Sequence, residues 1–410
     1  MIQWLLSGTV RQADAICKHV EKILHHQRDI LAPKALEEVE TALRDVRAAI
    51  KAKADNAALQ TQINKLEEAA GKWLKPYPNA AWRENVEVLL VALAVALGIR
   101  TFFVQPFKIP TGSMQPTLFG VNSDNLMNTP NFKFPAGLER VKQWFQGSSY
   151  LEVIAQADGE LRPPEPLTRF SNGQVQVVEP PVHFLIFNLK QTIYVGGVAH
   201  TMWFPPDYGG ATLEQRAGLF PGQTFHKGDT ILKLRVNAGD HLFVDRLTYN
   251  FVPPSRGQIV VFETKGIPQD MRDPYKMPDD QFYIKRLIGL SGENIQIGDD
   301  RHLVIDGQRL DATTPHFENV YGFDPKTPPR DSHFSGHVNA KTSGQGYPFF
   351  RDASSSYQIP EGNVMVMGDN TMNSLDSRFW GDFPQTSVIG RAFAVYWPIT
   401  DRFGWNCLVH

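Results

Sequence analysis

Ser113 lies just beyond a long apolar stretch and is the first residue of the chain whose position suggests chemistry. The stretch runs from Val88 to Val104, and residues 105–118 then read QPFKIPTGSMQPTL. A serine hydroxyl is a weak nucleophile until a neighbouring base removes its proton. Because the serine follows a membrane-length segment so closely, the sequence predicts substrates that lie on a membrane or emerge from it.

A base for Ser113 is not evident among the histidines. The chain has no GxSxG turn, since Gly289-Leu-Ser-Gly292 has the wrong spacing, and no histidine forms a triad signature. Lys285 stands in a strongly apolar strand pattern, FYIKRLI, over residues 282–288. Burial would lower the pKa of its amine and give the neutral form that a general base requires. The alternative is an ordinary strand lysine that points to solvent.

A polar loop directly follows an apolar strand pattern and provides partners for such a lysine. Residues 368–381 read GDNTMNSLDSRFWG. Most polar loops are simply turns. This loop, however, places a hydroxyl, a carboxylate and a guanidinium within five residues, at Ser374, Asp376 and Arg378. We expect the cluster to hold the amine of Lys285 and to pair with Arg286.

The apolar stretch before Ser113 has the length of a membrane span. A span needs about 20 apolar residues, and residues 86–104 reach this length if Glu87 and Arg100 lie near the two interfaces. Trp82 and Arg83 stand where an interfacial anchor is expected. The sequence predicts one transmembrane helix over residues 84–104, and the alternative is a buried helix of a soluble core. Basic residues before the span favour a cytoplasmic N-terminal side.

The N-terminal 80 residues are predicted to form a helical, coiled-coil-like arm. Apolar residues recur there in steps of three and four, in two registers separated by Asp55-Asn56. Two antiparallel helices in a hairpin and one long helix with a stutter fit this pattern equally well. The arm would either bind a partner or mediate oligomerisation, or it would act only as a spacer before the membrane. The two stripes are Leu36, Val39, Leu43, Val46 and Ile50, and then Leu59, Ile63, Leu66 and Ala70.

Beyond Ser113 the sequence is typical of a mainly β domain. Short runs rich in Val, Ile, Phe and Tyr alternate with Gly, Pro and Asn turns. We therefore expect antiparallel sheets as the fold of the catalytic part, after the helical arm and the single transmembrane helix. The predicted strands cover residues 173–178, 183–187, 193–195, 241–244, 258–262, 282–288, 364–367 and 388–396.

Composition and cysteine usage narrow the classes of function. The formal net charge of −2 offers no basic excess for nucleic acid. Cys17 and Cys407 stand at opposite ends of the chain, on either side of the predicted span, so we expect no disulfide between them. No CxxC, HExxH or Walker-type loop is present, which gives no support for a zinc, nucleotide or other cofactor.

Four segments in this order, after a predicted span, resemble type I signal peptidases, the membrane Ser/Lys-dyad proteases also called leader peptidases. The resemblance covers roughly residues 86–118 and 237–398 and implies a serine endopeptidase. Its implied reaction removes N-terminal signal peptides from exported preproteins after small-x-small sites. The matching segments are PTGSMQPTL at 110–118, GDHLFVDR at 239–246, RGQIVVF at 256–262 with YIKR at 283–286, and GDN at 368–370 followed by SLDSR at 374–378.

The resemblance assigns the reacting groups. It implies that Ser113 is the nucleophile and Lys285 the general base. The oxyanion hole of this family uses the backbone N–H of the nucleophile and a hydroxyl two residues earlier, which is Thr111 here where many members carry serine. Threonine keeps the donor, although its β-branch restricts the rotamer. An oxyanion donor is typically worth roughly 3 kcal/mol of the barrier, so this difference affects rate rather than identity.

The resemblance also assigns supporting groups and a substrate pocket. Ser374 would orient the lysine amine by a hydrogen bond, while Asp376 would pair with Arg286 and Arg378. Shallow apolar pockets would accept the small residues at −1 and −3 of the signal peptide, and the substrate would pair as an added β-strand. The implied pocket residues are Phe107, Ile109, Pro110, Met114, Leu118, Val261, Tyr283 and Ile284.

The matching segments divide the chain into a core and its additions. The predicted catalytic core comprises residues 105–118 and 237–410. A large β-rich insertion, residues 119–236, separates the nucleophile from the second motif, and a second β-rich subdomain occupies residues 299–358 within the core. The N-terminal arm, residues 1–80, is likewise an addition. These additions leave the implied catalytic residues intact.

The resemblance further implies partners and a location. The partners are signal peptides of exported preproteins, membrane lipid and the secretion translocon, with no nucleic acid. The location is the bacterial inner membrane, with the arm in the cytoplasm and the catalytic domain on the outer face. Two other functions remain as alternatives. One is a non-enzymatic membrane-anchored β-domain that recruits partners, and the other is a self-cleaving Ser/Lys protease of the repressor type.

Overall fold

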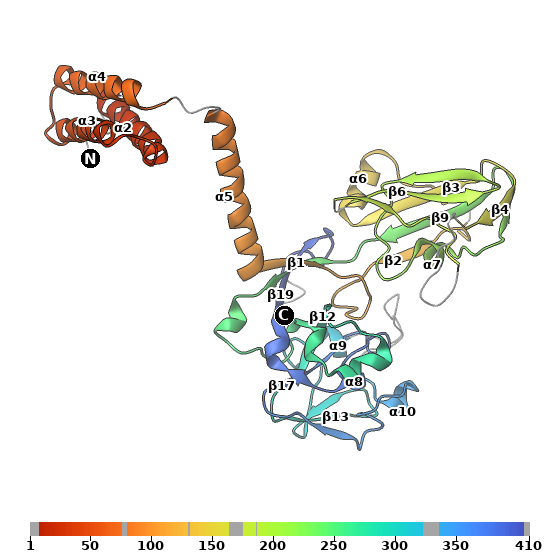
Figure 1. Ribbon diagram of the computed structural model, residues 1–410. Helices are drawn as coiled ribbons and strands as arrows, with labels where there is room; N and C mark the ends of the chain where they lie inside the picture. The colour runs from red at the N-terminus through yellow and green to blue at the C-terminus, as the bar shows by residue number, and fades with distance from the viewer. Residues whose placement is uncertain are drawn as a thin grey trace. The chain divides into compact units, whose positions relative to one another are not determined.

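The computed structural model describes residues 8–75, 80–129, 132–163, 175–185, 187–322 and 336–405 (Figure 1). The chain divides into two compact units, Met1–Val95 and Ala96–His410, and each is described by itself. Cys407 lies outside the described residues, whereas Cys17 is a buried free thiol.

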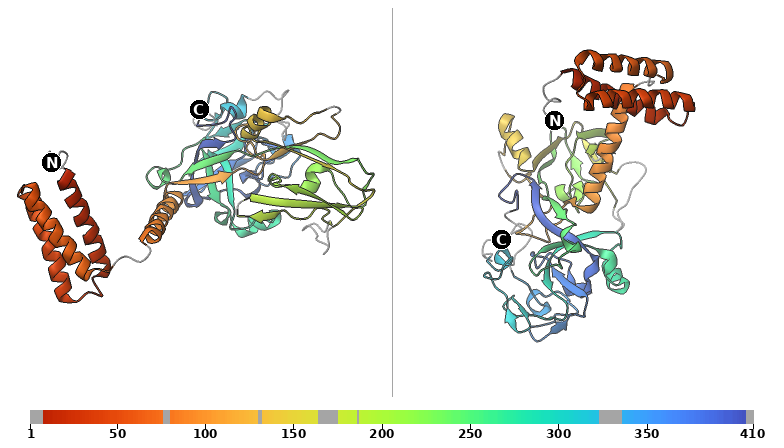
Figure 2. Two further views of the ribbon diagram at one scale, coloured as in Figure 1. Left: turned by 90° about the horizontal axis from the view of Figure 1, so that it is seen from above. Right: turned by 90° about the vertical axis from the view of Figure 1, so that its left-hand side faces the viewer.

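Three helices of the first unit pack around one apolar core. They are α2 (Gly8–Gln27), α3 (Pro33–Lys51) and α4 (Asn56–Trp73), which lie side by side in Figure 2. Asp55 caps α4 by accepting a 2.7 Å hydrogen bond from the backbone N–H of Ala58. The break at Asp55 therefore separates two helices, and α2 adds a third to the hairpin. The buried residues of this core include Cys17, Val20, Leu24, Val39, Leu43, Val46, Leu59, Ile63 and Leu66.

Helix α5 (Ala80–Phe102) contains the apolar stretch that precedes the serine. Residues Trp82–Phe102 are long and apolar enough to cross a membrane, and none of that stretch is buried against described protein. The alternative of a buried core helix therefore loses its support. The helix ends two residues earlier than predicted, because Val104 pairs with Asp245 and begins strand β1 (Val104–Lys108).

A seven-stranded antiparallel sheet forms the centre of the second unit. Its strand order is β1-β10-β19-β11-β12-β17-β18. Side chains alternate between its two faces: on β11, Val260 and Phe262 join one buried cluster, while Ile259 and Val261 join another. The further strands are β10 (His241–Asp245), β19 (Val388–Trp397), β11 (Ile259–Glu263), β12 (Phe282–Gly289), β17 (Asn363–Met367) and β18 (Phe383–Pro384).

A smaller sheet is formed within the core by the second predicted subdomain. Its order is β15-β14-β13-β16. The predicted boundary at residue 299 omits β13, which pairs with both β14 and β16. These strands are β13 (Asn294–Ile297), β14 (Leu303–Ile305), β15 (Gln308–Arg309) and β16 (Ser356–Gln358).

The insertion forms two sheets of its own. One has the order β2-β9-β3, and the other has the order β5-β6-β4-β8 with β7 paired to β6. The predicted boundary at residue 236 falls inside β9. These strands are β2 (Asn122–Asn125), β3 (Ser148–Ile154), β4 (Gly159–Arg162), β5 (Val182–Phe184), β6 (Phe187–Val195), β7 (Val198–Trp203), β8 (Thr224–Phe225) and β9 (Thr230–Asn237).

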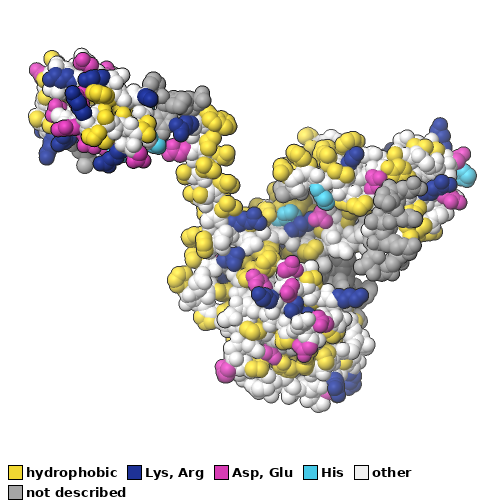
Figure 3. Space-filling view, viewed as in Figure 1, with side chains coloured by type: hydrophobic (Ala, Val, Ile, Leu, Met, Phe, Trp, Pro, Cys, Tyr) yellow, Lys and Arg dark blue, Asp and Glu magenta, His cyan; other side chains and the backbone are white. Residues whose placement is uncertain are grey.

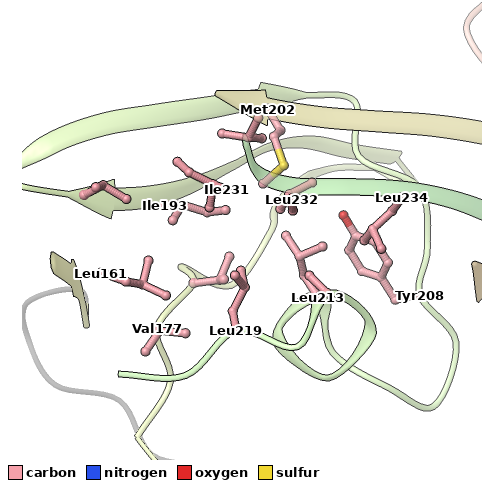
Figure 4. Close-up of a cluster of buried hydrophobic side chains, with 14 of the residues drawn as sticks. Leu161, Val177, Ile193, Met202, Tyr208, Leu213, Leu219, Ile231, Leu232 and Leu234 are labelled. Carbon is pink, nitrogen blue, oxygen red and sulfur yellow. The ribbon is translucent and has the colours of Figure 1, made fainter. Parts of the chain in front are cut away.

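An apolar cluster holds the insertion together (Figure 4). Ile193 and Leu232 are fully buried within it, and Leu213 of helix α7 (Leu213–Ala217) belongs to the same cluster. The strand predicted at residues 173–178 differs from the structure, since residues 173 and 174 lie outside the described part and Val178 makes only an isolated bridge with Ile193.

Short helices complete the second unit. Helix α6 (Gly137–Phe145) belongs to the insertion, and α11 (Ser377–Trp380) ends the polar loop that follows β17. The others are α8 (Gln269–Arg272), α9 (Glu318–Tyr321) and α10 (Ala340–Ser343), with 3-10 turns at Thr248–Asn250, Thr264–Gly266, Asp273–Tyr275 and Gln385–Ser387.

Candidate active site

The structure brings Ser113 and Lys285 into direct contact. Ser113 lies in the turn after β1, and Lys285 lies on β12. The Nζ atom of Lys285 donates to Oγ of Ser113 at 2.8 Å and to the carbonyl oxygen of Ile284 at 3.0 Å. Only 4% of Lys285 and 6% of Ser113 is exposed, so the alternative of a solvent-directed strand lysine is wrong.

The surroundings of Lys285 favour its neutral form. Burial lowers the pKa of its amine to about 8, although the carboxylates of Asp376 and Asp369 act in the opposite direction. The guanidinium of Arg378 adds to the lowering. An amine with this pKa is neutral in a useful fraction of molecules near neutral pH and can accept a proton from a hydroxyl within hydrogen-bond reach.

Arg378 and Asp376 form a fully buried ion pair behind this contact. Nε of Arg378 donates to Oδ1 of Asp376 at 2.8 Å, and Nη2 donates to Oδ2 at 2.7 Å. Burial alone would raise the pKa of the Asp376 carboxyl, but Arg378 and the backbone N–H of Gly368 outweigh it and lower that pKa. Oδ2 of Asp376 also accepts from the backbone N–H of Gly368 at 3.0 Å, which ties α11 to the end of β17 beside Ser113.

Arg286 pairs with Asp369 rather than with Asp376, which corrects the expected pairing. Nε of Arg286 donates to Oδ1 of Asp369 at 2.8 Å, and Nη2 donates to Oδ2 at 2.6 Å. Thr117 of the nucleophile segment donates to the same carboxylate at 2.5 Å. Successive side chains of a strand point to opposite faces, so Arg286 points away from the face of Lys285. Both oxygens of Asp376 are meanwhile occupied by Arg378.

Asn370 makes two hydrogen bonds to the turn that carries Ser113. Its backbone N–H donates to the carbonyl oxygen of Ser113 at 3.1 Å, and its side-chain amide donates to that of Gly112 at 2.9 Å. Our sequence reasoning did not assign roles to Asp369, Asn370 or Thr117. The signal was present, since all three lie within the quoted motifs and a buried Arg286 requires an acidic partner.

Ser374 lies beside the dyad without bonding to the lysine. Its Oγ is buried and makes no hydrogen bond with Lys285 among the described residues, while its hydroxyl is close enough to Asp376 to lower the pKa of that carboxyl. A Cβ added at Gly368 would lie 2.2 Å from Oγ of Ser374 and 2.4 Å from the carbonyl oxygen of Ser113. Glycine is therefore required where this loop passes the nucleophile turn.

A cavity of about 830 Å³ opens onto Ser113, Lys285 and Ser374. Thr111 lines it two residues before the serine, as an oxyanion donor would. Four predicted pocket residues also line it: Phe107, Pro110, Tyr283 and Ile284. Lining residues that we did not predict are Lys108, Asp280, Gln281, Phe282, Gln345, Met372, Asn373, Leu375 and Phe379.

The other four predicted pocket residues lie in the core beneath the cavity. Ile109, Met114, Leu118 and Val261 are each at most 2% exposed and pack in one buried cluster. Val261 is directly opposite Ile284 but stands on β11, which β12 and β19 enclose on both sides. β17 pairs with β12 from Arg286 to Gly289 but not at Ile284, and there β12 meets the cavity. These residues support the wall and do not form its surface.

No group of three or more His, Cys, Asp or Glu side chains that could hold a metal ion occurs among the described residues. The site is instead an amine, a hydroxyl and two buried ion pairs. This arrangement can deprotonate a serine and hold it against a bound carbonyl carbon.

Residues 82–132 and 232–397 match the family described as signal peptidase, peptidase S26, and make up more than half of the chain. A signal peptidase I from Leptolyngbya laminosa is 32% identical over 171 residues, which cover 42% of this chain and 65% of that protein. A signal peptidase I from Pseudomonas fluorescens is 27% identical over 191 residues, which cover 43% of this chain and 61% of that protein. A probable signal peptidase I-2 from Synechocystis is 27% identical over 166 residues, which cover 40% of this chain and 58% of that protein.

A crystal structure of a signal peptidase I from Enterococcus faecalis aligns with 34% of this chain and 97% of that one, at 25% identity and a TM-score of 0.22. The chain spans less than two thirds of the length of the three curated relatives named above. The family match leaves out residues 133–231 of the insertion but contains the serine, the lysine and both buried ion pairs. The chain therefore belongs to the signal peptidase family, peptidase S26.

Proposed function

We propose that this protein is a membrane-anchored serine endopeptidase that removes signal peptides after small-x-small sites. The observation that carries the proposal is the 2.8 Å hydrogen bond between Nζ of Lys285 and Oγ of Ser113, both buried. Family membership supports a peptidase, and the candidate membrane helix, which ends at Phe102 before β1 and the serine, supports a substrate held at a bilayer.

The reaction begins with proton transfer within the dyad. Neutral Lys285 takes the proton of Ser113 as Oγ attacks the scissile carbonyl carbon, and the carbonyl oxygen becomes an oxyanion. The backbone N–H of Ser113 and the hydroxyl of Thr111 stabilise that oxyanion. The resulting ammonium of Lys285 then gives its proton to the leaving amine as the peptide bond breaks. A water molecule, deprotonated by Lys285, hydrolyses the acyl-enzyme and frees Ser113.

The walls of the cavity support an extended substrate with small side chains. β1 stands at the end of the strand order in its sheet, and its residues Phe107 and Lys108 line the cavity. A substrate strand can therefore add along β1 or along the opposite wall formed by β12. Tyr283 and Ile284 leave room for small residues at −1 and −3, and bulky residues are excluded by steric clash.

The proposed location follows the anchoring helix and its flanking charges. Lys72 and Lys75 precede the helix and Arg83 lies in its first turn, and these basic residues favour a cytoplasmic N-terminal side. The catalytic unit would then lie on the outer face of the bacterial inner membrane, where signal peptides emerge from the secretion translocon.

Cleavage of a preprotein by the full-length chain in detergent tests the proposal. The substrate carries an Ala-x-Ala site, and mass spectrometry identifies the cleaved bond. Ser113→Ala should reduce the rate by at least about three orders of magnitude, because the members of a catalytic unit act together. Ser255→Ala, at an exposed serine, is the matched control and should leave the rate unchanged. Cleavage at the same bond by Ser113→Ala would refute the proposed nucleophile.

A further inference from the structure

Helix α6 of the insertion exposes its apolar side chains on the protein surface. Leu138, Val141, Trp144 and Phe145 are 89%, 51%, 55% and 45% exposed, and no residue of the helix is buried. At 3.6 residues per turn the four lie within an arc of roughly 120°. Figure 3 shows hydrophobic side chains over the region that Figure 1 labels α6.

The polar face of α6 is the face that contacts the protein. Gln143 donates to Glu139 at 3.0 Å and accepts from the hydroxyl of Tyr150 on β3. A surface helix of a globular protein normally buries its apolar face and exposes its polar one. The orientation of α6 is the reverse, so its apolar face is available to something outside the described chain.

The exposed apolar surface continues beyond the helix. The backbone N–H of Ile399 donates to the carbonyl oxygen of Phe145 at 2.9 Å, which joins α6 to the segment after β19. Ile399, Phe403 and Trp405 of that segment are 49%, 48% and 62% exposed. An exposed surface with this many aromatic side chains marks an interaction site rather than a scatter of single residues.

We propose that the exposed face of α6 is a second membrane contact, which lies in the headgroup region of a bilayer that contains anionic lipid. On a helical projection, Arg140 and Lys142 flank the apolar arc on its two sides, where they meet lipid phosphates. Trp and Phe side chains concentrate at membrane interfaces. The chain also carries its own candidate membrane helix, so a bilayer is already part of the proposed function.

Quenching of tryptophan fluorescence by brominated lipid tests this contact in the full-length protein. The protein is reconstituted into phosphatidylcholine vesicles with and without phosphatidylglycerol, and the emission of Trp144 is the difference between wild type and Trp144→Phe. We expect this emission to be strongly quenched in vesicles that contain phosphatidylglycerol. Trp144 emission that brominated lipid leaves unchanged would overturn the proposal and favour a protein partner for α6.

Two tryptophans calibrate the measurement, and two basic residues test the anionic preference. Trp82, at the start of the candidate span, should be quenched, whereas Trp380, which is 1% exposed and makes no hydrogen bond through Nε1, should not. Arg140→Glu with Lys142→Glu should weaken quenching of Trp144 several-fold in the phosphatidylglycerol vesicles. Equal quenching in this variant and in wild type would overturn the assignment to anionic lipid.

An independent observation concerns the loop of the insertion that follows β7. Asp207 accepts from Nζ of Lys108 at 2.5 Å and from the backbone N–H of Gly209 at 2.8 Å. A Cβ added at Gly209, whose φ is +70°, would lie 2.6 Å from the carbonyl oxygen of Pro110. A Cβ added at Gly210 would lie 3.6 Å from Cγ2 of Thr111. The loop therefore rests on the segment that leads to the nucleophile.

We infer that residues 207–210 position Pro110 and Thr111 on the rim of the cavity. This inference rests on the proposed function, because Thr111 acts there as an oxyanion donor. A displaced Thr111 should lower kcat and leave KM nearly unchanged, since an oxyanion donor acts mainly in the transition state.

Gly209→Ala and Gly222→Ala form a matched pair for this test. Both glycines have a positive φ, at +70° and +81°, but a Cβ at Gly222 would meet nothing within 4 Å. We expect Gly209→Ala to lower kcat by roughly tenfold, which is less than the loss of about 10²–10³ on removal of an oxyanion donor, and Gly222→Ala to retain it. Equal kcat values in the two variants would refute the positioning role. Loss of all cleavage in the wild type would instead refute the proposed function itself.

Discussion

The catalytic region and the insertion are stabilised by different kinds of contact. Around Ser113, Lys285 and two ion pairs are buried among hydrogen bonds. In the insertion, the buried cluster is mainly aliphatic and includes side chains of different sheets, such as Ile193 and Leu232. Apolar packing stabilises a folded protein directly, whereas a buried ion pair rarely adds more to the free energy of unfolding than apolar residues of the same shape would. The difference indicates that the polar interior of the catalytic region serves chemistry.

Lys285→Met should give the largest effect and separate chemistry from stability. Folding lowers the pKa of Lys285 to about 8, below the value of an unfolded lysine. The buried ammonium therefore destabilises the fold below pH 8, and this penalty is relieved as the pH rises from about 8 to the unfolded pKa near 10.4. Methionine removes it. Cleavage should fall by at least about three orders of magnitude, while the thermal midpoint at neutral pH should rise.

Thermal unfolding and preprotein cleavage are measured on the same preparation of Lys285→Met. Lys265→Ala, at an exposed lysine, provides the control and should change neither quantity. A lower thermal midpoint in Lys285→Met would show that Lys285 stabilises the site, contrary to the contrast drawn between the two regions.

Asp376→Ala should cause the largest loss of stability. It leaves Arg378 buried and without its ion-pair partner, which typically costs about 3–5 kcal/mol. Lys341→Ala breaks a pair with Asp299 whose side chains are 65% and 42% exposed, and should change the free energy of unfolding by less than about 1 kcal/mol. Chemical denaturation of both variants measures the difference. Similar losses in the two would contradict the distinction between buried and exposed pairs.

Ile193→Ala tests the other side of the comparison. It leaves a cavity in the apolar cluster of the insertion and should lower the free energy of unfolding by about 2–5 kcal/mol. The fully buried side chain belongs to that cluster and lies outside the cavity at Ser113. We therefore expect kcat to stay within about threefold of wild type below the unfolding temperature. A loss of kcat as large as that of Lys285→Met would show that the two regions are not separable.

The parts of the site that the sequence predicted are those with a local signature. The strongly apolar pattern of residues 282–288 identified the strand that carries Lys285, and the polar run at 374–378 identified Asp376 with Arg378. The partner of Arg286 was predicted wrongly, because two acidic residues stand in the same loop and only the sheet decides which one it meets.

The sequence did not distinguish residues that line the cavity from residues in the core, because neighbouring strands determine which side chains are exposed. Ile109 and Val261 have the same apolar character as Ile284, yet only Ile284 reaches the cavity. Gln345 also lines the cavity, but it lies in the second subdomain and belongs to no motif, so nothing in the sequence predicted it. The insertion gave strand patterns but no sign that the loop of Asp207 would contact Lys108, since 99 residues separate the two.

The dependence of kcat/KM on pH tests the central claim, that Lys285 activates Ser113 as a neutral amine. The full-length protein in detergent cleaves the Ala-x-Ala preprotein from about pH 6 to about pH 10, and a general base must be unprotonated to act. Because the pKa of Lys285 is lowered to about 8, kcat/KM should fall about tenfold per pH unit below that value and level off above it. A rate that stays constant from pH 8 down to pH 6 would contradict the claim.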